Sequence, residues 1–462
     1  MTLRRRTILR RPLALHAHVS RTSPGVAAAV SVALVILVFV AMPAVAQTGH
    51  FLSAAGPTDY SIAGASTAMP LDASGALYWN PASLMGLSGS ELDVGVLGVF
   101  PTTQLSSRVA PGAFGFGVPP IPLAGVSNAK RNPVLTPDFS IAWRPARSRW
   151  AYGVALTGVA GFGVDYARSP SNPVTTPPPP VGLGFGRIYS EYRLWQVTPA
   201  FAYRLGGHFS VGIAPLLLVG SLAATPLPFG QPDDANSDGF ATYPSATEKQ
   251  HSIGGGVQAG VYYGEPKGVH VGLAFKSRQT FQAFDMKATD ELGRPRSVST
   301  RIDAPMVVSL GLGYSGAERF AIAADVRYVD YDHTAGFEGA RFDARGALNG
   351  LGWDRMIVAA IGGQVAPEGP VSLRGGYSYN TNPIHETNAF VNVASPAINQ
   401  HTVYAGISIR ASSHVVLSGT YGHGFETSVS GPIATPAGFI PGTTVTSTLS
   451  TQAAAAGLRV LF

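Results

Sequence analysis

Apolar residues alternate with small or polar residues along much of this chain, and this period of two constrains the fold more than any other feature. In residues 269–276 the odd positions are Val, Val, Leu and Phe, whereas the even positions are His, Gly, Ala and Lys. Residues 195–203 and 403–410 follow the same pattern. Because successive side chains of a strand point to opposite faces, each segment has one apolar face. Only 13% of all residues are charged, so the other face is typical of a barrel lumen rather than of the surface of a soluble sandwich.

The connections between the alternating segments predict the number of strands. Short turns are expected at 147–148, 206–207, 266–267, 317–318, 368–369 and 412–413. Longer loops alternate with them, at about 101–136, 167–189, 227–250, 287–302, 336–352, 385–400 and 431–444. Six turns and seven loops join fourteen strands and place both termini in the periplasm. We therefore predict an all-β fold, a 14-stranded antiparallel transmembrane β-barrel.

The N-terminus has the pattern of an export signal. Five Arg residues within positions 4–11 precede an apolar run from Val26 to Met42, and the small-x-small sequence Ala44-Val45-Ala46 follows. This predicts a signal peptide over residues 1–46 and a mature chain that begins at Gln47. A retained membrane anchor is the alternative, but the run is short for a span and the cleavage sequence is well formed.

Removing the signal peptide changes the charge balance. It contains six of the 32 basic residues and no acidic residue, which leaves 26 basic against 26 acidic residues. A basic nucleic-acid-binding protein is therefore not supported. The chain has no Cys, which excludes disulfides, thiol nucleophiles and Cys metal sites. No run of 18 or more apolar residues follows the signal peptide, so a membrane-spanning form has to be a barrel, whose closed strand pairing satisfies every backbone group.

Residues 51–90 do not alternate and carry the most specific motif. A small-residue stretch leads through Leu71-Asp72-Ala73 to Asn80-Pro81-Ala82. The last predicted strand ends flush with the chain at an aromatic residue, Phe462. Together with the export signal and the fourteen strands, these features resemble the FadL/TodX family of outer-membrane transporters for hydrophobic compounds. The resemblance spans the mature chain, and its identity-level motifs lie within the stretch before the first strand.

The resemblance implies a domain organisation and a route. Residues 47–90 would form a hatch that plugs the lumen, and residues 91–462 would form the barrel. The gating residues of the hatch would be Asp72, Asn80, Pro81 and Ala82. Ligand would be captured by the extracellular loops, pass the hatch and leave sideways into the bilayer through a kinked third strand. Sideways exit suits an apolar solute, because each CH₂ removed from water gains ~0.8 kcal/mol. Long-chain fatty acids are the expected ligands, and aromatic or aliphatic hydrocarbons are the alternative.

The third predicted strand, at about 150–166, contains the parts that a lateral opening would need. They are Gly158, Gly161, Phe162 and Gly163. Gly within a strand favours a bulge or a break and removes side-chain cover, so we expect the opening here. The alternative is that Gly merely suits a crowded lumen.

Apolar residues in the first and last long loops are candidates for ligand capture. They are Phe114, Phe116, Val118, Ile121 and Leu123 in the first loop and Ile433, Phe439 and Ile440 in the last; of these, Phe114, Phe116, Ile121 and Phe439 are the main candidates. Exposed apolar loops are unfavourable unless they pack together or bind something. Packing of the loops on one another is therefore the alternative to ligand capture.

Extending the alternation into the lumen predicts a basic interior. The inward cations would be Arg144, Arg204, Lys276, Arg278, Arg327, Arg374, Arg410 and Arg459, against Asp325 and Asp354. Such a lumen would suit a fatty acid, because Arg forms bidentate contacts with carboxylates. Pairing with Asp59 and Asp72 of the hatch is favoured over ligand binding, because buried charges are normally paired. Lys276 and Arg278, as adjacent inward positions of one strand, are the pair predicted to bind a ligand carboxylate.

Two further motifs carry weaker signals. Asp234, Asn236 and Asp238 match the first half of a calcium loop, but position twelve is Ser245 and no helices are expected beside it. A solvated turn is favoured over calcium there. Residues 311–316 fit the dinucleotide fingerprint but lead into another strand rather than a helix, so this match is rejected. No cofactor is expected.

Functions of other classes have less support. A diffusion porin would need an open lumen, and the hatch argues against one. A barrel enzyme would need a Ser/His constellation at the rim, and none can be assembled, so we expect no enzyme. A surface adhesin or structural barrel is an alternative that the Pro- and Gly-rich loops leave open.

The expected location is the outer membrane of a Gram-negative bacterium. The expected partners are the transported compound, outer-membrane lipid with lipopolysaccharide, and the barrel-assembly machinery, which would contact Phe462. A monomer is expected, because a closed barrel leaves no sheet edge to pair with another chain.

Overall fold

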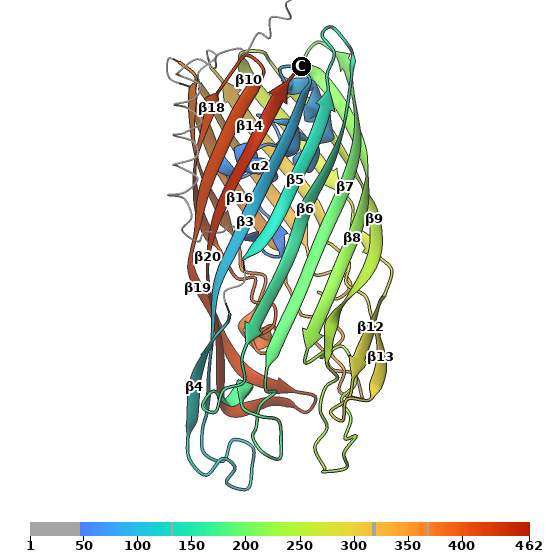
Figure 1. Ribbon diagram of the computed structural model, residues 1–462, viewed down its shortest axis with the longest axis vertical. Coiled ribbons are helices and arrows are strands. Elements are labelled where there is room, and N and C mark those ends of the chain that lie inside the picture. The colour runs from blue at the N-terminus through green and yellow to red at the C-terminus, as the bar shows by residue number, and fades with distance from the viewer. Residues whose placement is uncertain (1–46, 131–132, 317–319, 367–368) are drawn as a thin grey trace, which may run out of the picture.

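The computed structural model describes residues 47–130, 133–316, 320–366 and 369–462, so the predicted signal peptide lies outside the described residues. Long antiparallel strands form a closed barrel (Figure 1). The barrel strands are β3 (Glu91–Val109), β5 (Val134–Trp143), β6 (Trp150–Tyr166), β7 (Ile188–Gly206), β8 (Phe209–Thr225), β9 (Ala246–Gly264), β10 (Gly268–Lys276), β14 (Met306–Ser315), β15 (Phe320–Asp330), β16 (Met356–Val365), β17 (Val371–Asn380), β18 (His401–Arg410), β19 (Val415–Thr435) and β20 (Gly438–Leu461). The ring closes between β20 and β3, from Glu91 opposite Leu461 to Val109 opposite Thr443. The predicted 14-stranded antiparallel barrel is confirmed.

The alternation in the sequence becomes an apolar outer face and a packed inner face. On β10, Val269, Val271, Leu273 and Phe275 are exposed, whereas Gly272, Ala274 and Lys276 are buried in the lumen. Exposed Leu, Ile, Val and Phe side chains recur on the outward positions of most other barrel strands. Such a band is stable facing lipid and unfavourable in water.

The long loops gather at one end of the barrel, the lower end in Figure 1. This is the extracellular end, since the short turns and the C-terminus lie at the other. The loops hold β4 (Leu123–Asn128), the hairpin of β12 (Phe284–Thr289) and β13 (Pro295–Thr300), and the short helices η2 (Pro173–Thr175) and η3 (Glu386–Asn388).

Three of the predicted loops contain more strand than expected. The predicted loop 431–444 is a continuation of the β19–β20 hairpin, and β3 continues to Val109 where a loop was predicted from 101. The predicted loop 287–302 includes most of the β12–β13 hairpin, which is a separate two-stranded sheet. Gly- and Pro-bearing stretches were assigned to loops, but alternating Thr, Ser and Val residues within them support strand pairing.

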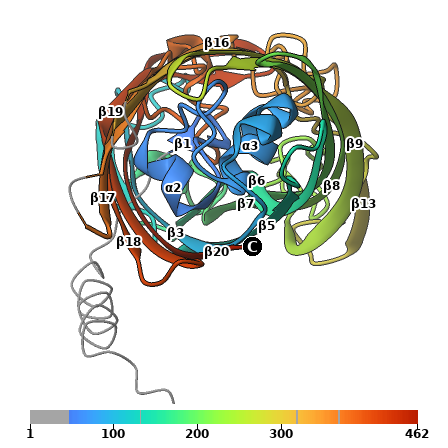
Figure 2. The ribbon, with the colours of Figure 1, turned by 90° about the horizontal axis from the view of Figure 1, so that it is seen from above.

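Residues 47–90 lie inside the ring of strands (Figure 2). They contain the strands β1 (Gln47–Thr48) and β2 (Phe51–Leu52) and the helices α2 (Gly56–Ser61), α3 (Ala73–Trp79) and η1 (Pro81–Gly86). Nearly all of their described side chains are buried. No helix among the described residues is long and apolar enough to cross a membrane.

Candidate functional site

The Asn-Pro-Ala motif anchors the hatch to the barrel wall. Asn80 caps η1, because its Oδ1 accepts a hydrogen bond from the backbone N–H of Ala82 at 3.1 Å. Its Nδ2 donates to the carbonyl of Thr67 at 2.9 Å and to the carbonyl of Val261 on β9 at 3.0 Å. Pro81 occupies the first turn of η1, where no backbone donor is needed. One buried side chain therefore satisfies backbone groups of both the hatch and the wall.

Two glycines in the wall make room for this motif. A Cβ on Gly260 would lie 2.0 Å from Oδ1 of Asn80, and a Cβ on Gly212 would lie 2.4 Å from the backbone N of Ala82. Both distances are well inside van der Waals contact. The glycines on inward positions of the strands are thus required, at these two sites, by the close approach of the hatch.

The lumenal arginines hold the hatch. Arg459 forms ion pairs with Asp72 at 3.2 Å and with Asp93 at 2.9 Å, and it donates to the carbonyl of Leu71 at 2.8 Å. Asp72 also caps α3 by accepting from the N–H of Gly75 at 2.8 Å. Pairing of the basic lumen with Asp72 is therefore present in the structure.

Other predicted inward cations divide into two groups. Arg327 pairs with Asp325 at 2.5 Å and stacks over Trp79 of the hatch, 3.5 Å from the ring centroid. Arg144 and Arg204 both donate to the carbonyl of Met85, and Arg374 bonds to side chains of the neighbouring strands. The prediction was wrong for Arg278, Arg410 and Asp354, which are exposed.

Arg278 lies outside the lumen because the strand carries an extra residue. Lys276 is opposite Gln258 on β9, whereas Thr280 of β11 (Thr280–Phe281) is opposite Gly255. The four steps from Lys276 to Thr280 are matched by only three steps on β9, so the even-numbered residues just after Lys276 exchange the lumenal face for the outer face. Arg278 cannot act with Lys276 on one ligand. Lys276 itself is 6% exposed, with its ammonium 4.6 Å from the ring centroid of Tyr78.

Asp59 of the hatch is held by hydrogen bonds rather than by an ion pair. It accepts hydrogen bonds from the backbone of Ala55, from Trp79 Nε1 at 3.1 Å and from Ser66, and it belongs to none of the described ion pairs. Complete burial, together with the nearby charge of Asp72, raises the pKa of Asp59 to about 7. The predicted pairing of Asp59 with a lumenal arginine is not present.

The barrel wall has a gap at the third strand. β5 pairs with β6 from Trp143 opposite Tyr152 to Asp138 opposite Thr157. Further along β6, the next described pairing with the chain segment that precedes β5 is the single bridge of Ala129 and Tyr166. A bulge interrupts β6 between Gly158 and Ala160. We call the part of β6 that does not pair with β5, residues 158–164, the lateral gap; it stays paired with β7 on its other side.

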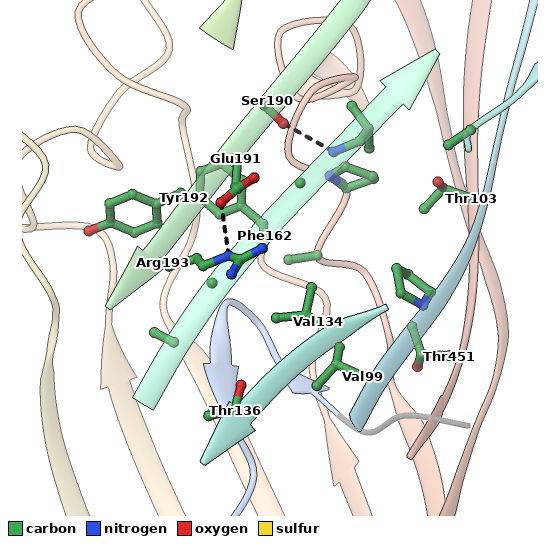
Figure 3. Close-up of a pocket in the computed structure, with 18 of the residues that line it drawn as sticks. Val99, Thr103, Val134, Thr136, Phe162, Ser190, Glu191, Tyr192, Arg193 and Thr451 are labelled. Carbon is green, nitrogen blue, oxygen red and sulfur yellow. Dashed lines mark hydrogen bonds and ion pairs between the residues drawn. The ribbon is translucent and has the colours of Figure 1, made fainter. Parts of the chain in front are cut away.

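A cavity of about 120 Å³ lies at the lateral gap, and we call it the wall cavity. All four residues predicted for a lateral opening line it, namely Gly158, Gly161, Phe162 and Gly163. Figure 3 shows Phe162 and Tyr192 at this cavity, with Val99, Val134 and Thr136 from the strands across the gap. The ion pair of Glu191 and Arg193 on β7, at 3.0 Å, also lines it.

The start of the hatch covers the inner side of the lateral gap. Phe51 of β2 is the strand partner of Ala160, and the carbonyl of His50 accepts from the N–H of Gly161 at 2.7 Å. The first residues of the hatch thus take the place that β5 leaves empty. Any movement of this segment would uncover the wall from within.

His50 sits in an aromatic cluster that the sequence reasoning missed. Its ring stacks on Phe51 and on Phe337, with centroids 4.6 Å and 4.9 Å away, and its Nδ1 lies 2.7 Å from the hydroxyl of Tyr331. Trp353 packs against the edge of the same ring at 6.0 Å. These residues come from the hatch and from one extracellular loop, so no periodic pattern could have indicated that they meet.

A second cavity, of about 330 Å³, lies among the extracellular loops, and we call it the loop cavity. Its lining includes Phe114, Phe185, Tyr243, Phe390 and Ile440. The ring of Phe185 lies 5.9 Å from that of Phe390 and 6.4 Å from that of Tyr243. Among the described residues, none of those that line this cavity is charged.

The loop candidates are only partly placed at this cavity. Phe114, Ile433 and Ile440 line it. Phe116, Ile121 and Phe439 do not, and all three are exposed. Phe116 has a positive φ of 48° between two glycines, which turns its side chain outward at a loop tip. Phe185 and Phe390 were not among the predicted capture residues, and only the packing of the loops identifies them.

Comparisons with known proteins agree with this architecture. A family model described as outer membrane protein transport protein (OMPP1/FadL/TodX) matches residues 37–460. The chain belongs to this family. It is therefore an outer-membrane barrel of a transport family for hydrophobic compounds, not of a family of enzymes.

Solved structures share the fold of this FadL/TodX-family protein. The toluene transporter TodX of Pseudomonas putida is 16% identical, with a TM-score of 0.66 over 89% of this chain and 99% of its own. A FadL homologue of Pseudomonas aeruginosa is 12% identical, with a TM-score of 0.66 over 90% and 100%. The toluene transporter TbuX of Ralstonia pickettii is 14% identical, with a TM-score of 0.62 over 89% and 99%. No curated protein sequence matches this chain.

The calcium candidate of this family member is a hydrogen-bonded turn. The carboxylate of Asp234 accepts from the N–H groups of Asp238 and Gly239, and Asn236 Oδ1 accepts from that of Asp238. The side-chain oxygens thus cap backbone donors. Within the described part of the chain, no group of three His, Asp or Glu residues is arranged to hold a metal ion.

Proposed function

We propose that this FadL/TodX-family protein carries small neutral hydrophobic compounds, aromatic hydrocarbons foremost, passively across the outer membrane. The observation that carries the proposal is the loop cavity, a space of about 330 Å³ with an aromatic and aliphatic lining and no charge among its described lining residues. A site of this kind gains free energy by burying apolar area. It offers no partner to a carboxylate, whose unpaired burial is strongly unfavourable.

The proposed route leads from the loop cavity past the start of the hatch to the wall cavity. The aromatic cluster of His50, Phe337 and Trp353 lies between the hatch and the loops, and Phe162 connects it to the lateral gap, with its ring 6.4 Å from that of Trp353. Displacement of residues 47–52 would open the wall from inside. The solute would then enter the hydrocarbon of the bilayer, where it is more stable than in water, so no energy source is needed.

A long-chain fatty acid is the second candidate, and Lys276 favours it. This ammonium is buried in the lumen, and it takes part in none of the described ion pairs. Its described contacts are cation–π contacts with Tyr78 and Trp79. A carboxylate arriving in the lumen would give Lys276 a charge partner, which the aromatic rings replace only in part.

The test is uptake in a host that lacks its own transporter for hydrophobic compounds, with labelled toluene and a labelled long-chain fatty acid in parallel. We expect faster toluene uptake, unchanged by Lys276→Met. Faster fatty-acid uptake alone, lost in Lys276→Met, would instead establish the second candidate. Acceleration of neither compound, with a folded barrel in the outer membrane, would contradict both.

A further inference from the structure

The outer surface beside the lateral gap carries charge where the strands leave the apolar band. The outward residues of β7 are apolar from Leu205 up to Trp195, and Arg193, Glu191 and Tyr189 follow toward the extracellular end. Arg187 precedes the strand on the same side. This surface therefore lies directly above the lipid-facing band, at the depth where lipid headgroups meet water.

Each carboxylate of this surface is covered by two cations. Asp165 pairs with Arg187 at 2.7 Å and with Lys130 at 3.6 Å. Its side chain is 8% exposed, whereas those of the two cations are about half-exposed or more. A second group, described next, also places two cations on one carboxylate. The surface as a whole therefore has four cations and two carboxylates, a net charge of +2.

That second group is built in the same way. Glu191, 18% exposed, pairs with Lys249 at 2.6 Å and with Arg193 at 3.0 Å. The hydroxyl of Tyr189 donates to Glu191 at 3.2 Å, and its ring lies 4.8 Å from the guanidinium carbon of Arg187. Tyr189 thus contacts both groups and links them into one surface. We call Lys130, Arg187, Arg193 and Lys249 the basic rim.

Small residues form the floor beneath these long side chains. Arg193 is opposite Gly161 on β6 and Ser221 on β8, and Glu191 is opposite Gly163 and Ala223. The side chains of the four cations are 35–65% exposed although each is ion-paired, so part of each stays open to a ligand. Guanidinium and ammonium groups are suited to phosphate oxygens.

We propose that the basic rim binds the phosphate groups of an outer-leaflet glycolipid at the mouth of the lateral gap. A lipid is the fitting occupant, because the rim continues directly into the apolar band on β7 and so presents cations above a surface for acyl chains. Lys130, Glu191 and Arg193 also line the wall cavity. The bound lipid would therefore stand beside the point at which the proposed solute enters the membrane. The inference rests on the membrane location of the barrel and does not depend on which compound is carried.

The test is binding of lipid A with two phosphates to the purified full-length barrel, measured by native mass spectrometry and by fluorescence titration. The variant Arg187→Gln with Lys249→Gln removes one cation from each group and leaves each carboxylate a partner. We expect its affinity for lipid A to fall about tenfold or more, the usual effect of losing charge-assisted hydrogen bonds. The control Arg294→Gln with Arg345→Gln removes the same charge from exposed loop arginines and is expected to bind like the original protein.

Heat-modifiable migration on gels verifies that each variant is folded. Lipid A stripped of its phosphates is expected to bind the original protein as weakly as intact lipid A binds the double variant. Equal affinity of the variant and the original protein, or equal binding of the stripped lipid, would overturn the proposal. Displacement of lipid A by inorganic phosphate at the same molar concentration would overturn the assignment to a lipid.

Discussion

At the scale of single residues, the hatch is held by side chains that complete backbone hydrogen bonding inside the lumen. Asn80 is the clearest example, because its two donated bonds reach Thr67 within the hatch and Val261 on the wall. The motif could be found in the sequence because it is short and contiguous. Its partners could not, since they depend on where β9 passes the hatch.

Asn80→Ala is expected to loosen the hatch without unfolding the barrel. Both carbonyl groups would lose a buried donor, at about 1–3 kcal/mol for each. The measurement is hydrogen exchange of residues 61–86, which should become markedly faster. Asn128→Ala, which removes an exposed amide of β4, is the matched control. Exchange equal to that of the control would show that Asn80 does not anchor the hatch.

Asp59 makes the docking of the hatch depend on pH. Its pKa is raised from 3.8 to about 7 in the folded state, so the folded hatch binds a proton that the unfolded hatch has already released. The resulting stabilisation is complete below pH 3.8 and is lost as the pH rises through 7, and it amounts to at most about 4 kcal/mol. Hatch amides should be better protected at pH 5 than at pH 8.

Asp59→Asn removes the titrating group while keeping the shape of the side chain. We expect the difference in hatch protection between pH 5 and pH 8 to shrink strongly in this variant. Any dependence on pH that remains comes from other buried carboxyls at the hatch, such as Asp72, whose pKa burial raises to about 6, and Asp138, which accepts a hydrogen bond from Ser74. An unchanged difference would mean that the dependence on pH comes from elsewhere.

Residue-level predictions from the sequence failed where a strand changes phase. Arg278 was assigned to the lumen by extending the alternation of β10, and one extra residue before β11 placed it outside. The same alternation correctly placed Lys276, Arg327 and Arg459 inside. A bulge leaves no mark in the polar stretch from Lys276 to Thr280, so alternation holds only within an uninterrupted ladder.

At the scale of elements, glycine in the third strand predicted an irregularity, and β6 has one between Gly158 and Ala160. The extent of the lateral gap could not be predicted from β6 alone. It depends on β5, whose residues 134–137 pair with β3 but not with β6. Only the three-strand arrangement shows how the hatch segment at Phe51 comes to cover the wall.

The loop cavity gives a prediction at the same scale. Phe390→Glu would place a charge in an apolar lining and is expected to lower toluene uptake about tenfold, the effect of ~1.4 kcal/mol. Phe116→Glu makes the same exchange at a fully exposed loop tip and should leave uptake unchanged. Equal uptake by the two variants would remove the loop cavity from the route.

At the scale of the whole molecule, the period of two, the spacing of turns and loops and the absence of long apolar runs were sufficient to predict the barrel. The cavities were not predictable in this way. The loop cavity combines residues from Phe114 to Ile440, and their meeting depends on the closure of the ring and on loop packing. The sequence thus predicts the wall of the barrel and its plug, whereas the spaces through which a solute would move require the folded molecule.

The central claim is that a hydrophobic solute leaves sideways through the wall, and one pair of variants tests it most directly. Leu135→Trp fills the outer mouth of the wall cavity from a lipid-facing position that is 61% exposed. Leu217→Trp makes the same exchange on β8, away from the gap, at a position that is 58% exposed. Both positions are exposed on the outer face, so the two barrels are expected to fold alike. We predict that toluene uptake falls about tenfold, as for a barrier raised by ~1.4 kcal/mol, in Leu135→Trp alone. Equal uptake by the two variants would contradict lateral exit.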